Sequence, residues 1–557
     1  MASAQQDEAN LQPFLQWLEA NGGQLRGCTI KSCGPNKGFG VFTSTSSSND
    51  GVAMVVPLDL AITPMRVLQD PFMAPICRSM YADGDVDDRF LIMLFLTIER
   101  LRPDSLWKPY LDMLPKTFGN PLWFKDDELV ELKGTTLYRA SQLQRRNLQV
   151  LYNEKVKGLV NELLGCDERA REVQFEDFLW ANSIFWTRAL NIPFPRSYVF
   201  PESVGGQGSN PGCQNSDFDA PLALKAGKKL DDTNVRNLKD GTVVSDKKGD
   251  DYGSRIQAEE TLWVEGLVPG IDFCNHGLMP VATWEVDRMG FVTGIPSSMY
   301  LMLAVPGSIE VDKEISISYG DKGNEELLYL YGFVIDNNPG DFLMVHYPME
   351  AFQNLPLFEG KGKLLELQKA ELRCLLPKSL LDNGFSAGCH KKEGSQLSSY
   401  SWSGQRKVPS YLQKSIFPQE FMAALRTIKM QDHEHMQVTS LLEELVESRD
   451  GGQTFDVEVQ AAVWETCGDH AALELLVDLL CLKLTELEDG SGPEETDSKL
   501  LEDFCNLHMS SKKVDEENFM TRNRWSCIVY RAGQKQLTRL FLKEAERALE
   551  LFAGEQP

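Results

Sequence analysis

The N-terminal part of the chain alternates between hydrophobic and polar residues in a way that predicts one helix and then a β-meander. Over 11–20, large apolar residues recur at helical spacing and stop at Asn21-Gly22-Gly23, which predicts a short helix. Short β-prone runs follow at 29–31, 40–43 and 53–57, separated by Gly, Asn and Ser. The chain therefore begins with an entry helix and short strands.

From 87 to about 185 the apolar residues recur at a helical period instead. One face of the first helix carries Phe90, Met93, Leu94 and Ile98. Further helical segments are predicted at 107–114, 148–164 and 175–185. This region therefore predicts a helical insert over 87–185.

The next stretch, 202–260, is rich in Gly, Asp, Lys, Ser and Asn and has few large apolar residues, which predicts a long, mobile surface loop. A second group of strands is then predicted from β-prone runs bounded by Gly or Pro, at 261–268, 281–286, 299–304 and 314–319.

Beyond about 342 the chain becomes largely helical again. A stripe at a 3.6-residue period consists of Leu537, Phe541, Ala545, Ala548 and Phe552. The acidic stretch 486–497, around Gly490, Gly492 and Pro493, predicts a solvated connection between helices. We therefore expect an α+β protein with an all-α C-terminal domain.

The composition is that of a folded protein. With 557 residues the chain is long enough for about two or three domains, and 42% hydrophobic and 25% charged residues are typical of a globular protein. The net charge of −25 opposes binding to a nucleic-acid backbone. It favours basic protein partners, or it only maintains solubility; the sequence leaves both interpretations open.

Residues 1–10 show neither a signal peptide nor a clear transit peptide, and Asp7 and Glu8 oppose both. No apolar run of about 18 residues follows, so we expect a soluble protein that does not act at a membrane. The 12 cysteines contain no Cys-x-x-Cys pair, which favours reduced thiols in the cytoplasm or the nucleus. We expect no metal site, because His433-Glu434-His435 lacks further ligands at a recognisable spacing.

Three separated motifs carry candidate chemistry. They are Asn-Lys-Gly-Phe-Gly-Val-Phe at 36–42, Pro-Gly-Ile-Asp-Phe-Cys-Asn-His at 269–276, and Ser-Ile-Ser-Tyr-Gly at 316–320, which leads to Asn324 and to Tyr-Gly-Phe at 331–333. Each motif alone is weak, since a Gly-x-Gly is usually a turn. In this order, however, they resemble a SET domain.

The resemblance is to the SET-domain subfamily that includes the Rubisco large-subunit lysine methyltransferase, and it covers nearly the whole chain. Supporting segments are Trp-Lys-Pro-Tyr at 107–110, Pro-Leu-Trp at 121–123 and Asn-Arg-Trp at 523–525. The chain departs from the family pattern in the long loop at 202–260 and in Gly323, where Ser is common.

The resemblance implies a SET β-fold with a pseudoknot. It divides the chain into an N-terminal SET part (1–86), a helical insert (87–185), a C-terminal SET part (186–341) and a helical substrate-binding domain (342–557). The implied function is transfer of a methyl group from S-adenosylmethionine to a lysine of a non-histone protein, by a monomer. Two alternatives remain open: methylation of a protein histidine, and a non-catalytic SET scaffold that binds basic proteins.

The family pattern also assigns roles to individual residues. Glycines at 38 and 40 let backbone atoms approach a small ligand, and an Asn side chain offers both a donor and an acceptor. By resemblance, the cofactor-binding residues are Lys37, Gly38, Phe39, Gly40, Arg188, Asn275, His276 and Phe333. The simpler alternatives are a hairpin turn at the glycines, a core Phe at 333 and a surface ion pair at Arg188.

Tyr319 is the candidate catalytic residue. Methyl transfer is a direct displacement by a neutral amine, so holding the reacting atoms in line supplies much of the catalysis. By resemblance, the phenol of Tyr319 orients the amine, and weak CH···O contacts hold the methyl group. Tyr331 would line an aromatic lysine channel, and Asp272 would help to position the lysine through its backbone.

Overall fold

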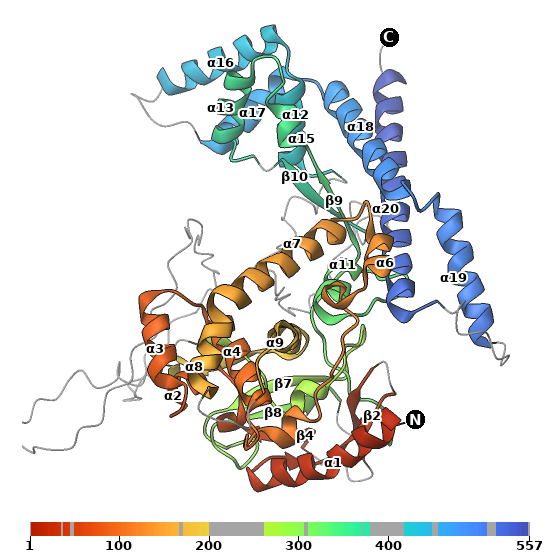
Figure 1. Ribbon diagram of the computed structural model, residues 1–557. Coiled ribbons are helices and arrows are strands. Elements are labelled where there is room, and N and C mark those ends of the chain that lie inside the picture. The colour runs from red at the N-terminus through yellow and green to blue at the C-terminus, as the bar shows by residue number, and fades with distance from the viewer. Residues whose placement is uncertain are drawn as a thin grey trace, which may run out of the picture. The chain divides into compact units, whose positions relative to one another are not determined.

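The computed structural model describes most of the chain and divides it into two compact units (Figure 1). One unit is formed by Met1–Lys116 and Val150–Ser318, and the other by Thr117–Gln149 and Tyr319–Pro557. The described residues are 2–34, 37–44, 50–165, 171–199, 261–305, 310–370, 372–378, 417–447, 455–509 and 520–554. The predicted loop at 202–260 lies outside them, and the four predicted domain boundaries stay predictions.

The first unit mixes short strands with helices. Its strands are β1 (Gln24–Leu25), β2 (Cys28–Ser32), β3 (Phe39–Thr43), β4 (Val52–Pro57), β5 (Leu190–Pro195), β6 (Thr261–Gly266), β7 (Ala282–Asp287) and β8 (Ser298–Leu303). Its helices are α1 (Ala2–Ala20), α2 (Pro64–Gln69), α3 (Ala74–Asp83), α4 (Asp88–Leu101), α5 (Lys108–Leu111), α8 (Lys157–Leu164), α9 (Phe175–Arg188) and α10 (Arg196–Val199), with short helical turns at η1 (Leu58–Leu60), η4 (Tyr152–Val156) and η6 (Ile271–Phe273).

The strands of this unit form antiparallel ladders. Strands β1, β4, β8 and β7 make a four-stranded sheet in that order, while β2 pairs with β3 and β5 with β6. In β4 the residues Val52 to Val56 are all buried, so both faces of this strand are covered. The strands predicted at 29–31, 40–43 and 53–57 are confirmed as β2, β3 and β4.

Helix α4 is the centre of the helical part of this unit. Asp87 caps its N-terminus by accepting a hydrogen bond from Phe90 N at 2.8 Å. Almost every side chain from Phe90 to Leu101 is buried, because α4 packs against α2, α5 and α9 rather than lying on a surface. Helix α1 begins at Ala2, nine residues before the predicted 11–20, and ends as predicted where Gly22 adopts φ +85°.

The strand predicted at 314–319 is wrong as a regular strand. Over the part in this unit, residues 314–318, the structure shows only isolated bridges, from Glu314 to Phe42 and from Ile317 to His276. The reason is that the segment changes partners after a few residues: Ile315 N donates to Val41 O, and Ile317 N donates to Asn275 O. A single residue of pairing on each side is too short for a ladder.

The second unit is mainly helical. Its helices are α6 (Asp126–Leu129), α7 (Thr136–Leu151, which crosses the boundary between the units), α11 (Asn324–Glu326), α12 (Met349–Phe352), α13 (Phe358–Leu367), α15 (Gln419–Lys429), α16 (Asp432–Glu447), α17 (Asp456–Thr466), α18 (Asp469–Glu488), α19 (Glu494–Met509) and α20 (Arg522–Gly554). Short turns are η2 (Pro121–Trp123), η3 (Val130–Leu132) and η7 (Leu327–Tyr331), and its strands are β9 (Phe342–His346) and β10 (Arg373–Pro377).

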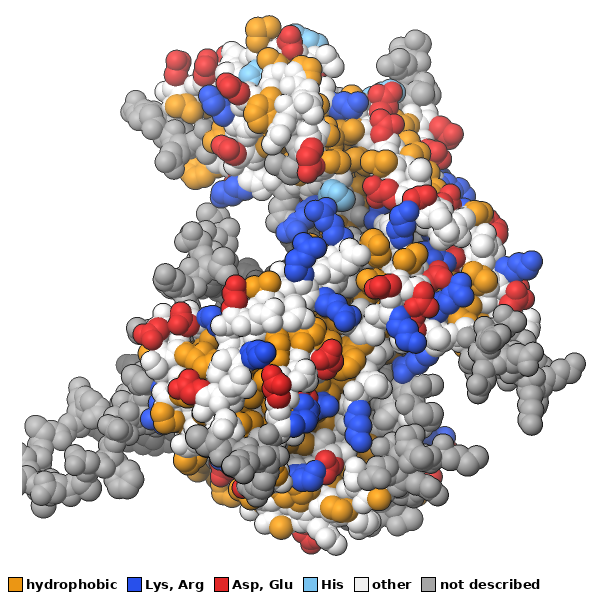
Figure 2. All heavy atoms as spheres, in the orientation of Figure 1, with side chains coloured by type: hydrophobic (Ala, Val, Ile, Leu, Met, Phe, Trp, Pro, Cys, Tyr) orange, Lys and Arg blue, Asp and Glu red, His pale blue; other side chains and the backbone are white. Residues whose placement is uncertain are grey.

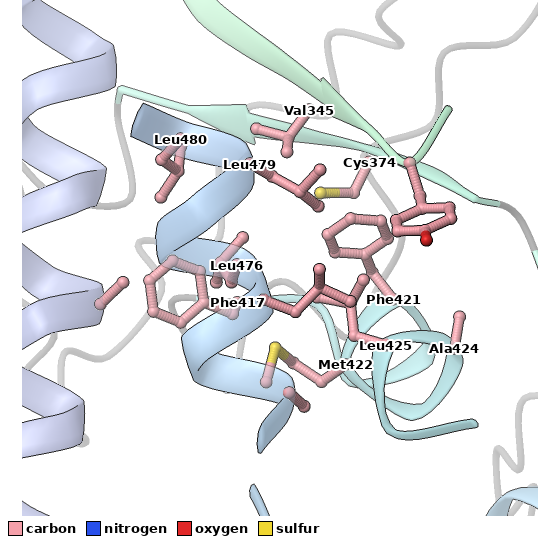
Figure 3. Close-up of a cluster of buried hydrophobic side chains, with 14 of the residues drawn as sticks. Val345, Cys374, Phe417, Phe421, Met422, Ala424, Leu425, Leu476, Leu479 and Leu480 are labelled. Carbon is pink, nitrogen blue, oxygen red and sulfur yellow. The ribbon is translucent and has the colours of Figure 1, made fainter. Parts of the chain in front are cut away.

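The largest core of this unit lies between the β9–β10 ladder and helices α15, α18 and α20 (Figure 3). Phe421 and Leu425 of α15 and Leu476 and Leu480 of α18 are buried in it, together with Val345 of β9. The C-terminal region is helical, as predicted, but the antiparallel β9–β10 pair was not expected from the sequence.

On the face shown in Figure 2, Lys and Arg side chains are interspersed with Asp and Glu side chains.

Candidate active site

The two glycines of the motif lie in the β2–β3 hairpin, Gly38 just before β3 and Gly40 within it. Gly38 has φ +72°, and its carbonyl oxygen accepts a hydrogen bond from Cys33 N at 2.7 Å. A Cβ atom on Gly38 would meet no described atom within 4 Å, so this side of the turn is open. Gly40 is the opposite case, because a Cβ there would lie 2.6 Å from Cys33 Sγ. One glycine leaves room for a ligand, and the other lets neighbouring side chains approach the backbone.

The first unit brings the glycine motif and the Asn-His motif together. Asn275 Nδ2 donates to Phe39 O at 3.3 Å, although these residues are 236 positions apart. The segment 314–317 lies beside both motifs: Ile315 bonds to the backbone of β3, and Ile317 pairs in parallel with His276. Tyr319 follows this segment after one further residue in the chain.

The amide of Asn275 has a defined orientation. Its Nδ2 donates to Glu314 Oε1 at 2.8 Å as well as to Phe39 O, and Cys33 Sγ lies 3.8 Å away. A carboxylate and a carbonyl only accept, which fixes the nitrogen on their side. The amide oxygen accepts no hydrogen bond from any described residue, so it can accept one from a ligand.

A buried polar cluster supports the turn just before Asn275. Asp272 in η6 accepts hydrogen bonds from Tyr110 OH at 2.6 Å and from Gly270 N at 3.0 Å. Arg188, at the end of α9, donates to the Asp272 carbonyl at 2.9 Å and lies above the Phe273 ring. Arg188 Nε is buried and has no hydrogen-bond partner in the described part of the chain. The cluster therefore fixes the backbone at 271–274 and leaves one donor available.

Burial raises the pKa of Asp272 to about 6, although Arg188 and the Tyr110 hydroxyl favour the charged form. For Tyr110, burial is again the main cause of a raised pKa, and the nearby Asp272 charge adds to it. The phenol therefore stays protonated and acts as a donor to the carboxylate. Burial, together with the charge of Glu314, also raises the pKa of Cys33 to about 11, so this thiol is not a nucleophile near pH 7.

We predict that Asp272 makes the stability of the protein depend on pH between about 4 and 6. Because its pKa is higher in the folded state than the ordinary value near 3.9, the folded protein binds the proton more tightly. Ionisation therefore lowers the free energy of unfolding as the pH rises through this window, by about 2–3 kcal/mol. Asp272→Asn removes this contribution, so urea titrations at several pH values should show a smaller decline for the variant than for the wild type.

Asp341, whose pKa burial also raises to about 6, contributes to both proteins and cancels in this comparison. Parallel pH profiles for the wild type and Asp272→Asn would show that Asp272 does not titrate in this range.

The second unit holds three of the candidate aromatic residues. The rings of Tyr319 and Tyr331 stack with centroids 4.7 Å apart and an interplanar angle of 28°, and the Tyr331 and Phe333 centroids are 6.3 Å apart. Gly332, between them, has φ +75° and packs directly against Gly119, so only glycine fits there. This packing holds the Tyr-Gly-Phe motif in place.

Each unit thus collects its own part of the predicted site. In the first unit, Phe39 bonds to Asn275, Lys37 pairs with Glu314, His276 pairs with Ile317, and Arg188 bonds to Asp272. The second unit groups Tyr319, Tyr331 and Phe333. The roles of all these residues stay predictions.

Sequence reasoning missed Glu314 and Tyr110 as site residues. Glu314 lies in the segment predicted as a strand, and Tyr110 lies in a segment predicted as a helix, so neither was considered as a site residue. The available signal was the position of Glu314 two residues before the Ser-Ile-Ser-Tyr-Gly motif, and of Tyr110 at the end of Trp-Lys-Pro-Tyr. Neither signal indicates a contact with a distant motif, which only the fold creates.

No family model matches the sequence. Among curated proteins, the chain is 25% identical over 287 residues to a chloroplast fructose-bisphosphate aldolase lysine N-methyltransferase of Arabidopsis thaliana, covering 47% of this chain and 57% of that protein. It is 27% identical over 183 residues to the chloroplast Rubisco large-subunit N-methyltransferase of Pisum sativum, covering 32% and 35%. It is also 27% identical over 188 residues to the actin-histidine N-methyltransferase of Homo sapiens, covering 32% and 30%.

Two solved structures resemble nearly the whole chain. Rubisco LSMT bound to AdoMet has a TM-score of 0.57 at 17% identity, covering 97% of this chain and 92% of that chain. The SET domain of LSMT bound to lysine and AdoHcy has a TM-score of 0.55 at 18% identity, covering 98% and 93%. The fold is therefore the α+β SET fold followed by a helical region, as predicted. The chain is a distant relative of the Rubisco LSMT-like SET-domain proteins.

The chain spans between about a third and just over half of the length of these curated relatives. Two of the three are named as chloroplast proteins, and the cytoplasmic or nuclear location predicted from the sequence stays a prediction. None of the helices that the structure describes is both long and apolar enough to cross a membrane.

Proposed function

We propose that the chain is an S-adenosylmethionine-dependent methyltransferase that modifies a lysine side chain of a non-histone protein. The observation that carries the proposal is the meeting of the glycine hairpin, Asn275 and the segment leading to Tyr319 in the first unit. These are the motifs that carried the family resemblance, and they are far apart in sequence. The relatives named above support the reaction class, because all three are protein N-methyltransferases.

The residues of the first unit fit S-adenosylmethionine. The open side of Gly38 offers backbone atoms, and the free amide oxygen of Asn275 offers an acceptor for the amino group of its methionine part. The buried Nε of Arg188 is an available donor on the same unit. Lys37, Phe39, Gly40 and His276 are the further residues of this unit that we propose for this role. For Phe333, which lies in the second unit, we propose the cofactor-binding role that the resemblance implies. When bound, S-adenosylmethionine supplies a methyl group on a cationic sulfur.

On the substrate side, the chain must hold a lysine amine in its neutral form. An apolar, aromatic channel disfavours the ammonium form and lowers the amine pKa from about 10.4. We assign this channel to the stacked rings of Tyr319 and Tyr331. The Tyr319 hydroxyl would orient the amine lone pair. For Asp272, in the first unit, we propose the role that the resemblance implies, which is to help position the lysine through its backbone carbonyl oxygen, held by Arg188.

Methylation of a histidine is the second candidate, because the actin-histidine relatives are as similar to this chain as the Rubisco-modifying relative. We expect purified protein, incubated with labelled S-adenosylmethionine and a lysate of cells that lack it, to label at least one protein. Mass spectrometry of the labelled peptide then identifies the residue. Label on lysine supports the proposal, and label only on histidine replaces it with the second candidate.

Calorimetry distinguishes the proposed enzyme from a scaffold without catalytic activity. The proposal predicts heat of binding for S-adenosylmethionine with the full chain, whereas a scaffold that has lost its site binds none.

A further inference from the structure

We propose that Glu314 is a positioning residue that holds the Asn275 amide with its oxygen toward the amino group of bound S-adenosylmethionine. The inference rests on the proposed function and assigns a role to a residue outside the predicted site. Glu314 does not need to touch the cofactor for this role. It acts through Asn275.

The carboxylate of Glu314 lies at the centre of a small polar cluster. Its Oε1 accepts from Asn275 Nδ2 at 2.8 Å, and its Oε2 forms an ion pair with Lys37 Nζ at 2.5 Å. Cys33 Sγ donates to Oε1 at 3.7 Å. One carboxylate therefore links the glycine hairpin to the Asn-His motif.

These contacts decide which way the amide faces. An Asn side chain can turn over and exchange its oxygen and nitrogen, and the two orientations offer a ligand opposite groups. Glu314 accepts a charge-assisted hydrogen bond, which is stronger than a neutral one. It therefore favours the orientation with nitrogen inward, and the outward oxygen is the group that an ammonium ion needs.

The absence of a side chain at Gly40 is what permits this arrangement. A Cβ atom there would lie 3.1 Å from Glu314 Oε1, 3.1 Å from Asn275 Nδ2 and 2.6 Å from Cys33 Sγ. The glycine therefore leaves space for the carboxylate and the amide to meet beside the hairpin. The contact between Glu314 and Asn275 therefore requires glycine at position 40, independently of the geometry of the turn.

The charge of Glu314 also matters. Lys37, in the same hairpin, would repel the ammonium group of a ligand. Its ion pair with Glu314 offsets that charge.

The simpler interpretation is that Glu314 only attaches its segment to the hairpin. Backbone hydrogen bonds already do so, from Ile315 N to Val41 O at 2.7 Å and from Thr43 N to Lys313 O at 2.9 Å. Asp312 offers a matched control, since it lies two residues before Glu314 and pairs with Lys31 of β2. None of its side-chain contacts with the described residues is with Asn275. Asp312→Ala removes a carboxylate–lysine pair of the same kind.

The test compares two ligands on the full chain by calorimetry. S-adenosylhomocysteine carries the amino acid part, and methylthioadenosine shares the adenosine and the sulfur but lacks it. We expect Glu314→Ala to weaken S-adenosylhomocysteine binding about tenfold and to leave methylthioadenosine binding unchanged. Glu314→Gln keeps an acceptor for Asn275, so its loss should be smaller. Asp312→Ala should change neither affinity.

Equal weakening of both ligands by Glu314→Ala would mean a structural role only, and no weakening of either would mean no role; both results overturn the inference. Should Glu314→Ala not fold, Glu314→Gln decides by the same comparison, with a smaller but selective loss expected. If the wild type binds neither ligand, the proposed function itself fails.

Discussion

Replacing Tyr319 by Phe is expected to slow methyl transfer by about 100-fold or more while leaving the affinity for S-adenosylmethionine nearly unchanged. The variant keeps the ring that stacks on Tyr331 and loses only the hydroxyl that we propose to orient the amine. The measurement is the rate of methyl transfer at saturating cofactor, together with calorimetry of cofactor binding.

Tyr329→Phe is a suitable control for this variant. Tyr329 lies in the same short helix as Tyr331, and burial raises its pKa to about 12, but its side chain packs in a different hydrophobic cluster. A rate close to wild type is expected for the control. If Tyr319→Phe also retains the wild-type rate, the hydroxyl has no part in the reaction.

Replacing Asp497 by Ala is expected to destabilise the second unit by about 3–5 kcal/mol. The sequence placed this residue in a solvated acidic connection, and that prediction is wrong at Asp497. Its carboxylate is fully buried, pairs with Arg531 and lies 2.7 Å from Lys535 Nζ, and both cations are buried as well. Without the carboxylate, two buried positive charges would lose a shared partner.

Thermal unfolding of the full chain measures this effect as a lower midpoint. Glu495→Ala is the control, since Glu495 belongs to the same acidic stretch but its ion pair with Arg539 is exposed. The control should unfold like the wild type. Equal midpoints for Asp497→Ala and the control would show that the buried ion pairs contribute no net stability.

The elements that could be predicted from the sequence are those whose hydrophobic pattern is bounded by clear turn or capping residues. Strands β2, β3 and β4 alternate or run apolar between turn residues, and the ends of α4 and α1 carry a recognisable cap and a glycine. The connection after α18 was also predicted, because Gly490, Gly492 and Pro493 interrupt the helical pattern.

What the sequence could not predict depends on contacts between distant segments. The pattern of 314–319 is that of a strand, but the fold gives it two different partners. Asp497 is acidic like its neighbours in the sequence. It is buried because Arg531 and Lys535 of α20 pack against it. Glu314 likewise carries no mark of its contact with Asn275, which lies 39 residues earlier in the chain.

The most direct test of the central claim is a crystal structure of the full chain with S-adenosylhomocysteine. We expect the amino acid part of the ligand between the Gly38–Gly40 turn and the Asn275 side chain, with its amino group within hydrogen-bond distance of the Asn275 amide oxygen. A ligand bound elsewhere, or a ligand amino group remote from the Asn275 amide oxygen, would contradict the account.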